Sequence, residues 1–135
     1  MPEINVLPSL TLAYWCVLVA VALPYLCAYI AKIGGGFVPR DNHAPREWAQ
    51  RQSGWRARAN AAQENSFEGL PFFIGAVIIA HQLGAAQPTL NLLAVAYVLL
   101  RLVFIALYLR GFSSLRSAFW MLGFLVNIAI VFAGR

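Results

Sequence analysis

The stretch that decides the fold of this chain is residues 58–73, which read RANAAQENSFEGLPFF. It begins as a charged, alanine-rich helix pattern and runs directly into a long apolar segment. At about 100° per residue, Arg58, Asn65 and Glu68 lie within roughly 80° of arc on one helix face. The stretch therefore predicts a helix that carries a cation, an amide and an anion on one side. Because the helix continues into the membrane, these groups would lie below its surface, where burying polar groups is costly in free energy.

The composition around this stretch indicates an integral membrane protein. Of the 135 residues, 61% are hydrophobic and 11% are charged, and the mean hydropathy is +0.68. These values are too apolar for a soluble domain of this size. The length allows about four membrane-spanning helices of roughly 20 residues each, which leaves no room for a separate soluble catalytic domain.

The expected fold class is therefore all-α, an integral membrane four-helix bundle with four transmembrane helices per subunit. A single domain is expected over residues 1–135, with helices at about residues 10–33, 57–82, 90–109 and 112–133. The polar connection before the second helix is expected to lie as a loop along the lipid headgroups, because Trp48 and Trp55 alternate there with arginines.

The distribution of basic residues predicts the orientation in the membrane. The first and third loops, with their flanks, contain Lys32, Arg40, Arg46, Arg51, Arg56, Arg58, Arg110 and Arg116. The second loop has no Lys or Arg, so both termini are expected to face away from the cytoplasm, and the expected location is a bacterial inner membrane. The net charge of +5 then serves contact with anionic membrane lipids, and no nucleic-acid partner is expected.

Neither a metal site nor a disulfide is expected. His43 stands alone in the polar connection, without a second His, Cys or carboxylate at ligand spacing. Cys16 and Cys27 are about 16 Å apart along one helix, which is too far for a disulfide. Both cysteines are interpreted as small hydrophobic residues.

Arg101 is the main polar candidate in the third helix. A buried arginine is costly unless it pairs or faces a polar cavity, so it is a functional candidate, with a structural ion pair as the alternative. Glu68 and Arg101 are each expected about 12 to 16 Å inside the cytoplasmic ends of their helices, where they could pair or bracket a ligand. Tyr108 lies two turns further along the Arg101 face. Asn127 in the fourth helix is expected to hydrogen-bond to a neighbouring helix.

These polar groups suit a small zwitterionic, peptide-like ligand. Arginines bind carboxylates, a carboxylate binds an ammonium, and a side-chain amide fixes a peptide unit. An arginine beside a thiol favours the thiolate, which is the nucleophile. No cysteine of the chain is placed for that role, so the thiol is expected to come from a cofactor.

The order of these residues resembles the MAPEG family (membrane-associated proteins in eicosanoid and glutathione metabolism). Asn65 and Glu68 match its Asn-x-x-Glu motif, and Pro71 matches the proline that follows. Further residues similar to the third and fourth helices of its prostaglandin E and leukotriene synthases are Arg101, Tyr108, Arg116, Ser117 and Trp120. The resemblance covers most of the chain from about residue 39 to residue 120.

The resemblance implies a homotrimer of four-helix subunits, with glutathione bound between adjacent subunits near the cytoplasmic side. Arg116 would be the catalytic arginine that stabilises the thiolate, with Ser117 beside it. The residues expected to bind glutathione are Arg58, Asn65, Glu68, Arg101, Tyr108 and Trp120. Three departures from the family pattern stand out: Ala61 replaces an arginine, Trp120 replaces a tyrosine, and the turn before Arg116 is about one residue shorter.

Three functions are therefore considered. The leading hypothesis is a glutathione-dependent membrane enzyme that activates the thiol for conjugation to, or reduction of, a lipophilic electrophile arriving from the bilayer. The second is a membrane protein of the same fold that binds a small ligand without catalysis, which would suit Ala61 and Trp120. The third is a small proton-coupled exporter that uses Glu68 as its intramembrane carboxylate.

Overall fold

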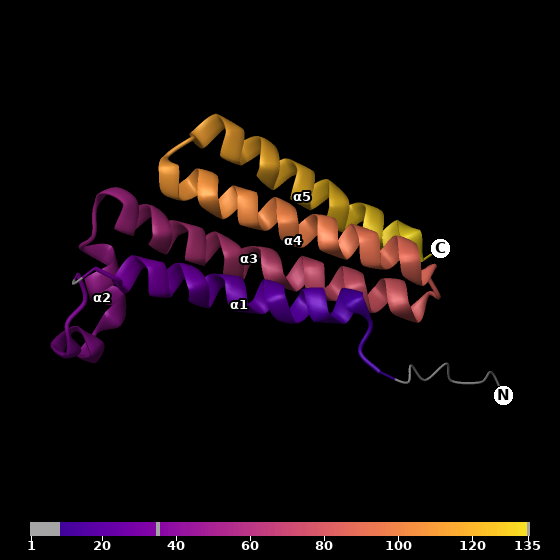
Figure 1. The fold of residues 1–135 in the computed structure, drawn as a ribbon, viewed down its shortest axis with the longest axis horizontal. Coiled ribbons are helices and arrows are strands. Elements are labelled where there is room, and N and C mark those ends of the chain that lie inside the picture. The colour runs from indigo at the N-terminus through magenta and orange to yellow at the C-terminus, as the bar shows by residue number, and fades with distance from the viewer. Residues whose placement is uncertain (1–8, 35, 135) are drawn as a thin grey trace.

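The computed structural model describes residues 9–34 and 36–134, in which four long helices lie side by side and no strand occurs (Figure 1). The long helices are α1 (Leu12–Lys32), α3 (Gly54–Gln82), α4 (Gln87–Arg110) and α5 (Ser113–Ala133). Two short helices, η1 (Pro39–His43) and α2 (Pro45–Gln50), lie between α1 and α3. The all-α prediction is confirmed for the described part of the chain.

Three of the long helices have the length and composition of membrane spans. Within the described residues these are α1, α4 and α5, which together make this an integral, multi-pass membrane protein. Helix α3 packs against all three of the others. The sequence of α3 is less apolar than the sequences of the other three long helices, because its first half carries the polar residues of the stretch 58–73.

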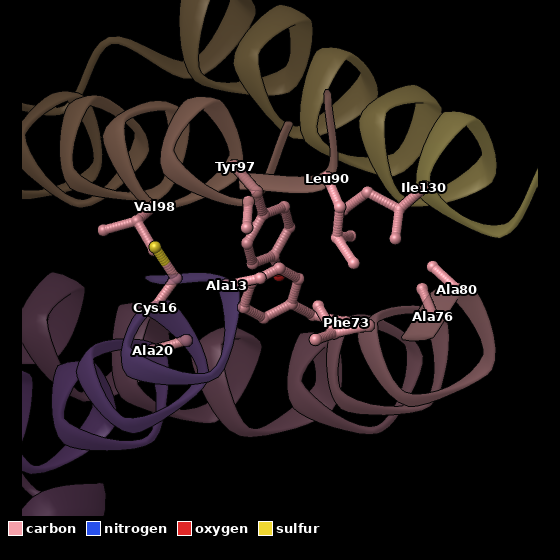
Figure 2. Packing of buried hydrophobic residues seen from close by; sticks show 12 residues of the cluster. Ala13, Cys16, Ala20, Phe73, Ala76, Ala80, Leu90, Tyr97, Val98 and Ile130 are labelled. Atoms are coloured by element: carbon pink, nitrogen blue, oxygen red, sulfur yellow. The ribbon is translucent and has the colours of Figure 1, made fainter. Parts of the chain in front are cut away.

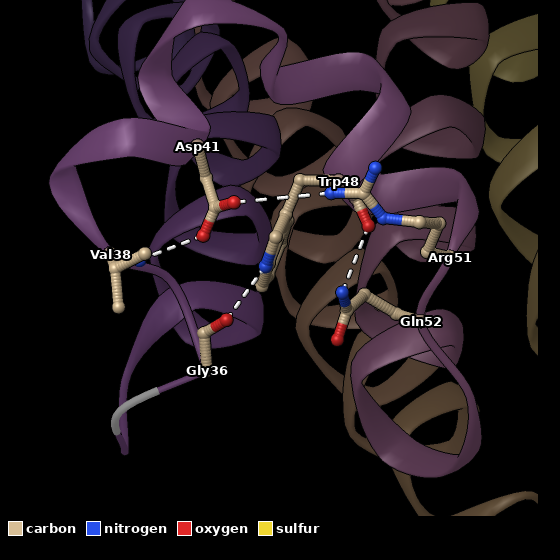
Figure 3. A network of polar contacts seen from close by, with 6 residues as sticks. All are labelled: Gly36, Val38, Asp41, Trp48, Arg51 and Gln52. Carbon is tan, nitrogen blue, oxygen red and sulfur yellow. Dashed lines mark hydrogen bonds and ion pairs between the residues drawn. The ribbon is translucent and has the colours of Figure 1, made fainter.

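The connection between α1 and α3 is more ordered than the expected loop. Pro39 and Pro45 each stand at the start of a short helix, where the fixed φ of proline favours helix initiation. Trp48 is only 3% exposed, and its Nε1 donates to the Gly36 carbonyl at 2.6 Å. Trp48 therefore anchors this segment to the bundle, and the prediction of an indole lying along the headgroups was wrong for it. Figure 3 shows the surrounding polar contacts.

Small side chains allow the helices to approach closely. Figure 2 shows Ala13, Cys16 and Ala20 of α1 facing the core, with Ala76 and Ala80 on α3. Close packing of this kind stabilises helix pairs in membranes, where burial from water contributes little. Both cysteines are free and buried.

The start of α3 is tied to the end of α1 by an arginine. Arg56 Nη1 donates to the carbonyl oxygens of Ala31 and Ile33, at 2.9 and 2.8 Å. The last carbonyls of a helix lack intrahelical donors, so the guanidinium satisfies groups that would otherwise need water. This contact fixes the polar half of α3, which includes Asn65 and Glu68, against α1.

Candidate functional site

Arg101 links α4 to α3 in the middle of the bundle. It is 5% exposed, and its Nη2 donates to Asn65 Oδ1 at 2.9 Å and to Ser66 Oγ at 3.2 Å. Its guanidinium carbon also lies 4.2 Å from the ring centroid of Phe104, a cation–π distance. No ion pair to Glu68 is present among the described residues, so the buried arginine is held by neutral oxygens and an aromatic face.

A cavity of about 250 Å³, here called the inner cavity, lies beside this arginine between α3, α4 and α5. It contains both Glu68 and Arg101, and half of the remaining lining residues are aromatic. The lining residues are Asn65, Glu68, Gly69, Phe72, Tyr97, Arg101, Trp120, Gly123, Phe124 and Asn127. The inner cavity thus places charged and amide groups beside aromatic rings.

A second cavity of about 200 Å³, here called the outer cavity, lies closer to the α4–α5 turn. Its lining residues are Asn65, Phe104, Tyr108, Arg116, Ser117 and Trp120. The Arg116 guanidinium carbon lies 4.1 Å from the centroid of the Tyr108 ring, so the aromatic face orients the cation. Asn65 and Trp120 line both cavities, which makes them neighbouring parts of one site.

The structure brings together seven of the eight residues that the sequence singled out. Those that line the inner or outer cavity are Asn65, Glu68, Arg101, Tyr108, Arg116, Ser117 and Trp120. Within this group, the Ser117 hydroxyl donates to the Ser113 carbonyl at 3.0 Å inside α5. Ser117 therefore lies beside Arg116, but its hydroxyl proton is engaged in a hydrogen bond within α5.

Arg58 is the exception. Its Nε donates to the Leu109 carbonyl at 2.9 Å, at the end of α4, and its side chain passes Gly111, which has a φ of 81°. Arg58 lines neither the inner nor the outer cavity. In the described structure it satisfies a terminal carbonyl of α4, as Arg56 does for α1.

Sequence reasoning missed Tyr97 and Asn127 as members of the site. Both line the inner cavity and both are nearly fully buried. The Asn127 side chain interacts with Tyr97 on the neighbouring helix α4, as expected of an interhelical contact, but its Oδ1 has no hydrogen-bond partner. The available signal was a pair of glycines, Gly69 and Gly123. A Cβ at either position would lie within 4 Å of Tyr97.

Comparison with known proteins gives the family of the chain. The model of the MAPEG family matches residues 12–134, nearly the whole chain. The chain belongs to the MAPEG family. No curated protein and no solved structure matches it.

Membership in the MAPEG family gives the site its chemical context. MAPEG proteins are membrane proteins of a glutathione-related transferase and synthase type, and they generally use glutathione. The residues that match the MAPEG Asn-x-x-Glu motif, Asn65 and Glu68, line the inner cavity. Ala61, at the position of a family arginine, instead lines a separate cavity of about 530 Å³ beside α2 and α3.

Proposed function

We propose that this protein is a glutathione-dependent membrane enzyme that activates the glutathione thiol for conjugation to, or reduction of, a lipophilic electrophile. The observation that carries the proposal is that Asn65 and Trp120 line both cavities. The two cavities thereby form one continuous site. Arg116 lies at its outer end, and the separate charges of Glu68 and Arg101 lie at its inner end. Each cavity alone is below the usual range for a small-molecule site, about 300 to 1,000 Å³.

The donor and acceptor groups of this site fit glutathione. Arg101 uses Nη2 for its bonds to Asn65 and Ser66, and a guanidinium has further N–H donors for a carboxylate. Glu68 offers a carboxylate for an ammonium. Trp120 and Phe104 supply an apolar wall between these groups. Glutathione contributes the thiol, whose thiolate is the nucleophile.

Arg116 is proposed to favour the thiolate. Its guanidinium is held against the Tyr108 ring, which restricts the positive charge to the outer cavity. A fixed cation beside a thiol stabilises the charged form without reorganisation of solvent. Asn65 and Arg101 hold the rest of the glutathione molecule, so that the sulfur faces Arg116 and a substrate entering from the bilayer.

We further propose that the working unit is a homotrimer with the site completed by an adjacent subunit. Glu68 and Ser117 are exposed in the single subunit, although each lines a cavity, so a second surface is needed to enclose a ligand there. The same proposal includes α3 as the fourth transmembrane span, termini away from the cytoplasm, and a bacterial inner membrane.

The test is glutathione-dependent turnover of 1-chloro-2,4-dinitrobenzene by purified protein, with Arg110→Ala as the matched control for Arg116→Ala. Arg110 ends α4 and lines neither cavity. Arg116→Ala is expected to lower kcat at least tenfold, since one preorganised charge contributes about that much or more, while Arg110→Ala leaves it unchanged. Equal activity of the two variants would remove Arg116 from the mechanism.

A protein that binds glutathione without catalysis is the second candidate, and Trp120 favours it. This residue occupies the wall between the cavities where the resembled enzymes carry a tyrosine. Calorimetric titration with glutathione separates the readings. Binding without turnover of any electrophile supports the second candidate. Absence of glutathione binding contradicts both candidates and favours the proton-coupled exporter that uses Glu68.

A further inference from the structure

The inner cavity contains a polar group that the proposed thiol chemistry does not use. Asn127 of α5 is 3% exposed, and its Oδ1 is the one buried side-chain oxygen or nitrogen in residues 9–34 and 36–134 without a hydrogen-bond partner. Leaving a buried acceptor unpaired is costly, so native proteins rarely do it. Since Asn127 lines the inner cavity, the missing donor can come from a molecule bound there.

Tyr97 of α4 also lines the cavity, and its side chain interacts with that of Asn127. A Cβ built at Gly69 would lie 3.2 Å from the Tyr97 hydroxyl oxygen, and one built at Gly123 would lie 3.6 Å from its ring. The ring itself stacks on Phe73, with centroids 4.1 Å apart (Figure 2). The two glycines therefore make room for a tyrosine hydroxyl deep in the bundle, and the polar end of the cavity is built by all three helices.

Three further aromatic rings line the cavity together with Asn65, Glu68 and Arg101. Phe72 meets Phe124 edge to face with centroids 5.4 Å apart, and Trp120 stacks on Phe124 at 5.5 Å. Trp120 and Phe124 are also exposed on the outside of the subunit, so an apolar molecule can reach the cavity from that side. A dry cavity of about 150 Å³ already holds a benzene ring, and the inner cavity is larger.

We propose that the part of the inner cavity lined by Tyr97, Gly123 and Asn127 binds the hydroxyl-bearing end of a small lipophilic molecule, next to the Glu68 and Arg101 groups assigned to glutathione. Its O–H donates to Asn127 Oδ1 while its apolar body lies against the Phe72 and Phe124 rings. The inference rests on the proposed function, because it names the class of lipophilic substrate that the same site takes. Asn127 is then a specificity-determining residue. It recognises the hydrogen-bond donor of the substrate and has no role in activating the thiol.

The test compares 4-propylphenol with its methyl ether, 4-propylanisole, which has nearly the same apolar body and no donor. Binding to the full chain in micelles, without glutathione, is followed by quenching of tryptophan fluorescence, since Trp120 lines the cavity. The measured quantity is the Kd of the methyl ether divided by the Kd of the phenol. This ratio is expected to be about threefold to tenfold larger for wild type than for Asn127→Leu, which is the range for one net hydrogen bond. Partition into the micelle affects both proteins alike, so it cancels when the two ratios are compared.

Two further variants make the comparison specific. Asn91→Leu is the matched control, because Asn91 Oδ1 already accepts from the Ala13 and Gln87 nitrogens and lies outside the cavity. It is expected to keep the preference for the phenol. Gly123→Ala is expected to weaken both ligands by a similar factor, because a methyl group narrows the cavity beside Tyr97. This variant keeps the test informative if Asn127→Leu does not fold.

An unchanged phenol preference in Asn127→Leu would overturn the inference and assign the donor at Asn127 to an internal water. Undiminished binding of both ligands by Gly123→Ala would overturn it as well, because the ligands would then bind elsewhere. Glutathione titration of the same preparations reports separately on the proposed function. Normal glutathione binding with no change in the phenol preference removes only the inference about Asn127.

Discussion

Arg101 of α4 and Asn65 of α3 are joined by a hydrogen bond of 2.9 Å between the guanidinium and the amide oxygen. The family motif residue therefore has a structural role before any ligand binds, because it satisfies a buried charge. Ligand binding and helix packing share this contact. Their energetic contributions can be separated by substitution.

Asn65→Ala is expected to lower the stability of the protein and to weaken glutathione binding. The change leaves Arg101 with Ser66 as its remaining polar partner, and loss of a bond to a buried charged group costs about 1 to 3 kcal/mol. Thermal unfolding in detergent measures the effect. Asn60→Ala, which loses only a bond to the Ala49 carbonyl, serves as the control and should shift Tm less. A larger shift for Asn60→Ala would contradict the central role of Asn65.

Arg58→Ala is expected to lower Tm while leaving the Kd for glutathione within about twofold. Its Nε satisfies the Leu109 carbonyl, and such a bond contributes roughly 1 to 3 kcal/mol. Arg110→Ala, at the same end of α4, is the control and should change neither quantity. A tenfold rise in Kd with an unchanged Tm would instead make Arg58 a ligand-binding residue.

Gly111→Ala is expected to destabilise the turn between α4 and α5. Gly111 has a φ of 81°, a conformation that costs an L-residue about 1 to 2 kcal/mol. Gly111→Asn should lower Tm less than Gly111→Ala, because asparagine adopts left-handed conformations more readily. Equal losses from the two substitutions would point to the nearby Arg58 side chain, and not to the backbone, as the cause.

Trp48→Phe is expected to loosen the segment between α1 and α3. The change removes the bond from Nε1 to the Gly36 carbonyl at a buried position, at a cost of about 1 to 3 kcal/mol. Trp55→Phe is the control, because Trp55 is 41% exposed and keeps an aromatic face for Arg56. Similar Tm values for the two variants would show that Trp48 contributes packing alone.

The membrane fold was predictable because apolar length and composition decide it locally. The same holds for the convergence of Asn65, Arg101 and Arg116, since helical periodicity and alternating helix direction bring one end of α3, α4 and α5 together. Family resemblance supplied the roles. Neither argument needed a tertiary contact.

Contacts between distant elements were not predictable. Trp48 is buried because η1 and α2 fold back on the bundle, and a sequence with arginines and tryptophans equally suits a surface loop. Arg58 lies on the polar face of α3, but its hydrogen-bond acceptor is a backbone carbonyl at the end of α4. A pattern of side chains in the sequence cannot predict a contact with a backbone group. The inner cavity depends in the same way on two glycines that lie 54 positions apart in the chain and matter only because Tyr97 lies between them.

The arginines at the start of α3 have a consequence for how the protein is made. Arg56 finds its acceptors on α1, which has already been synthesised, whereas the partners of Arg58 and Asn65 lie on α4, which follows. The polar half of α3 therefore has no complete set of partners until α4 emerges from the ribosome. We expect α3 and α4 to enter the membrane together as a hairpin, with release of α3 into lipid delayed until its neighbour arrives.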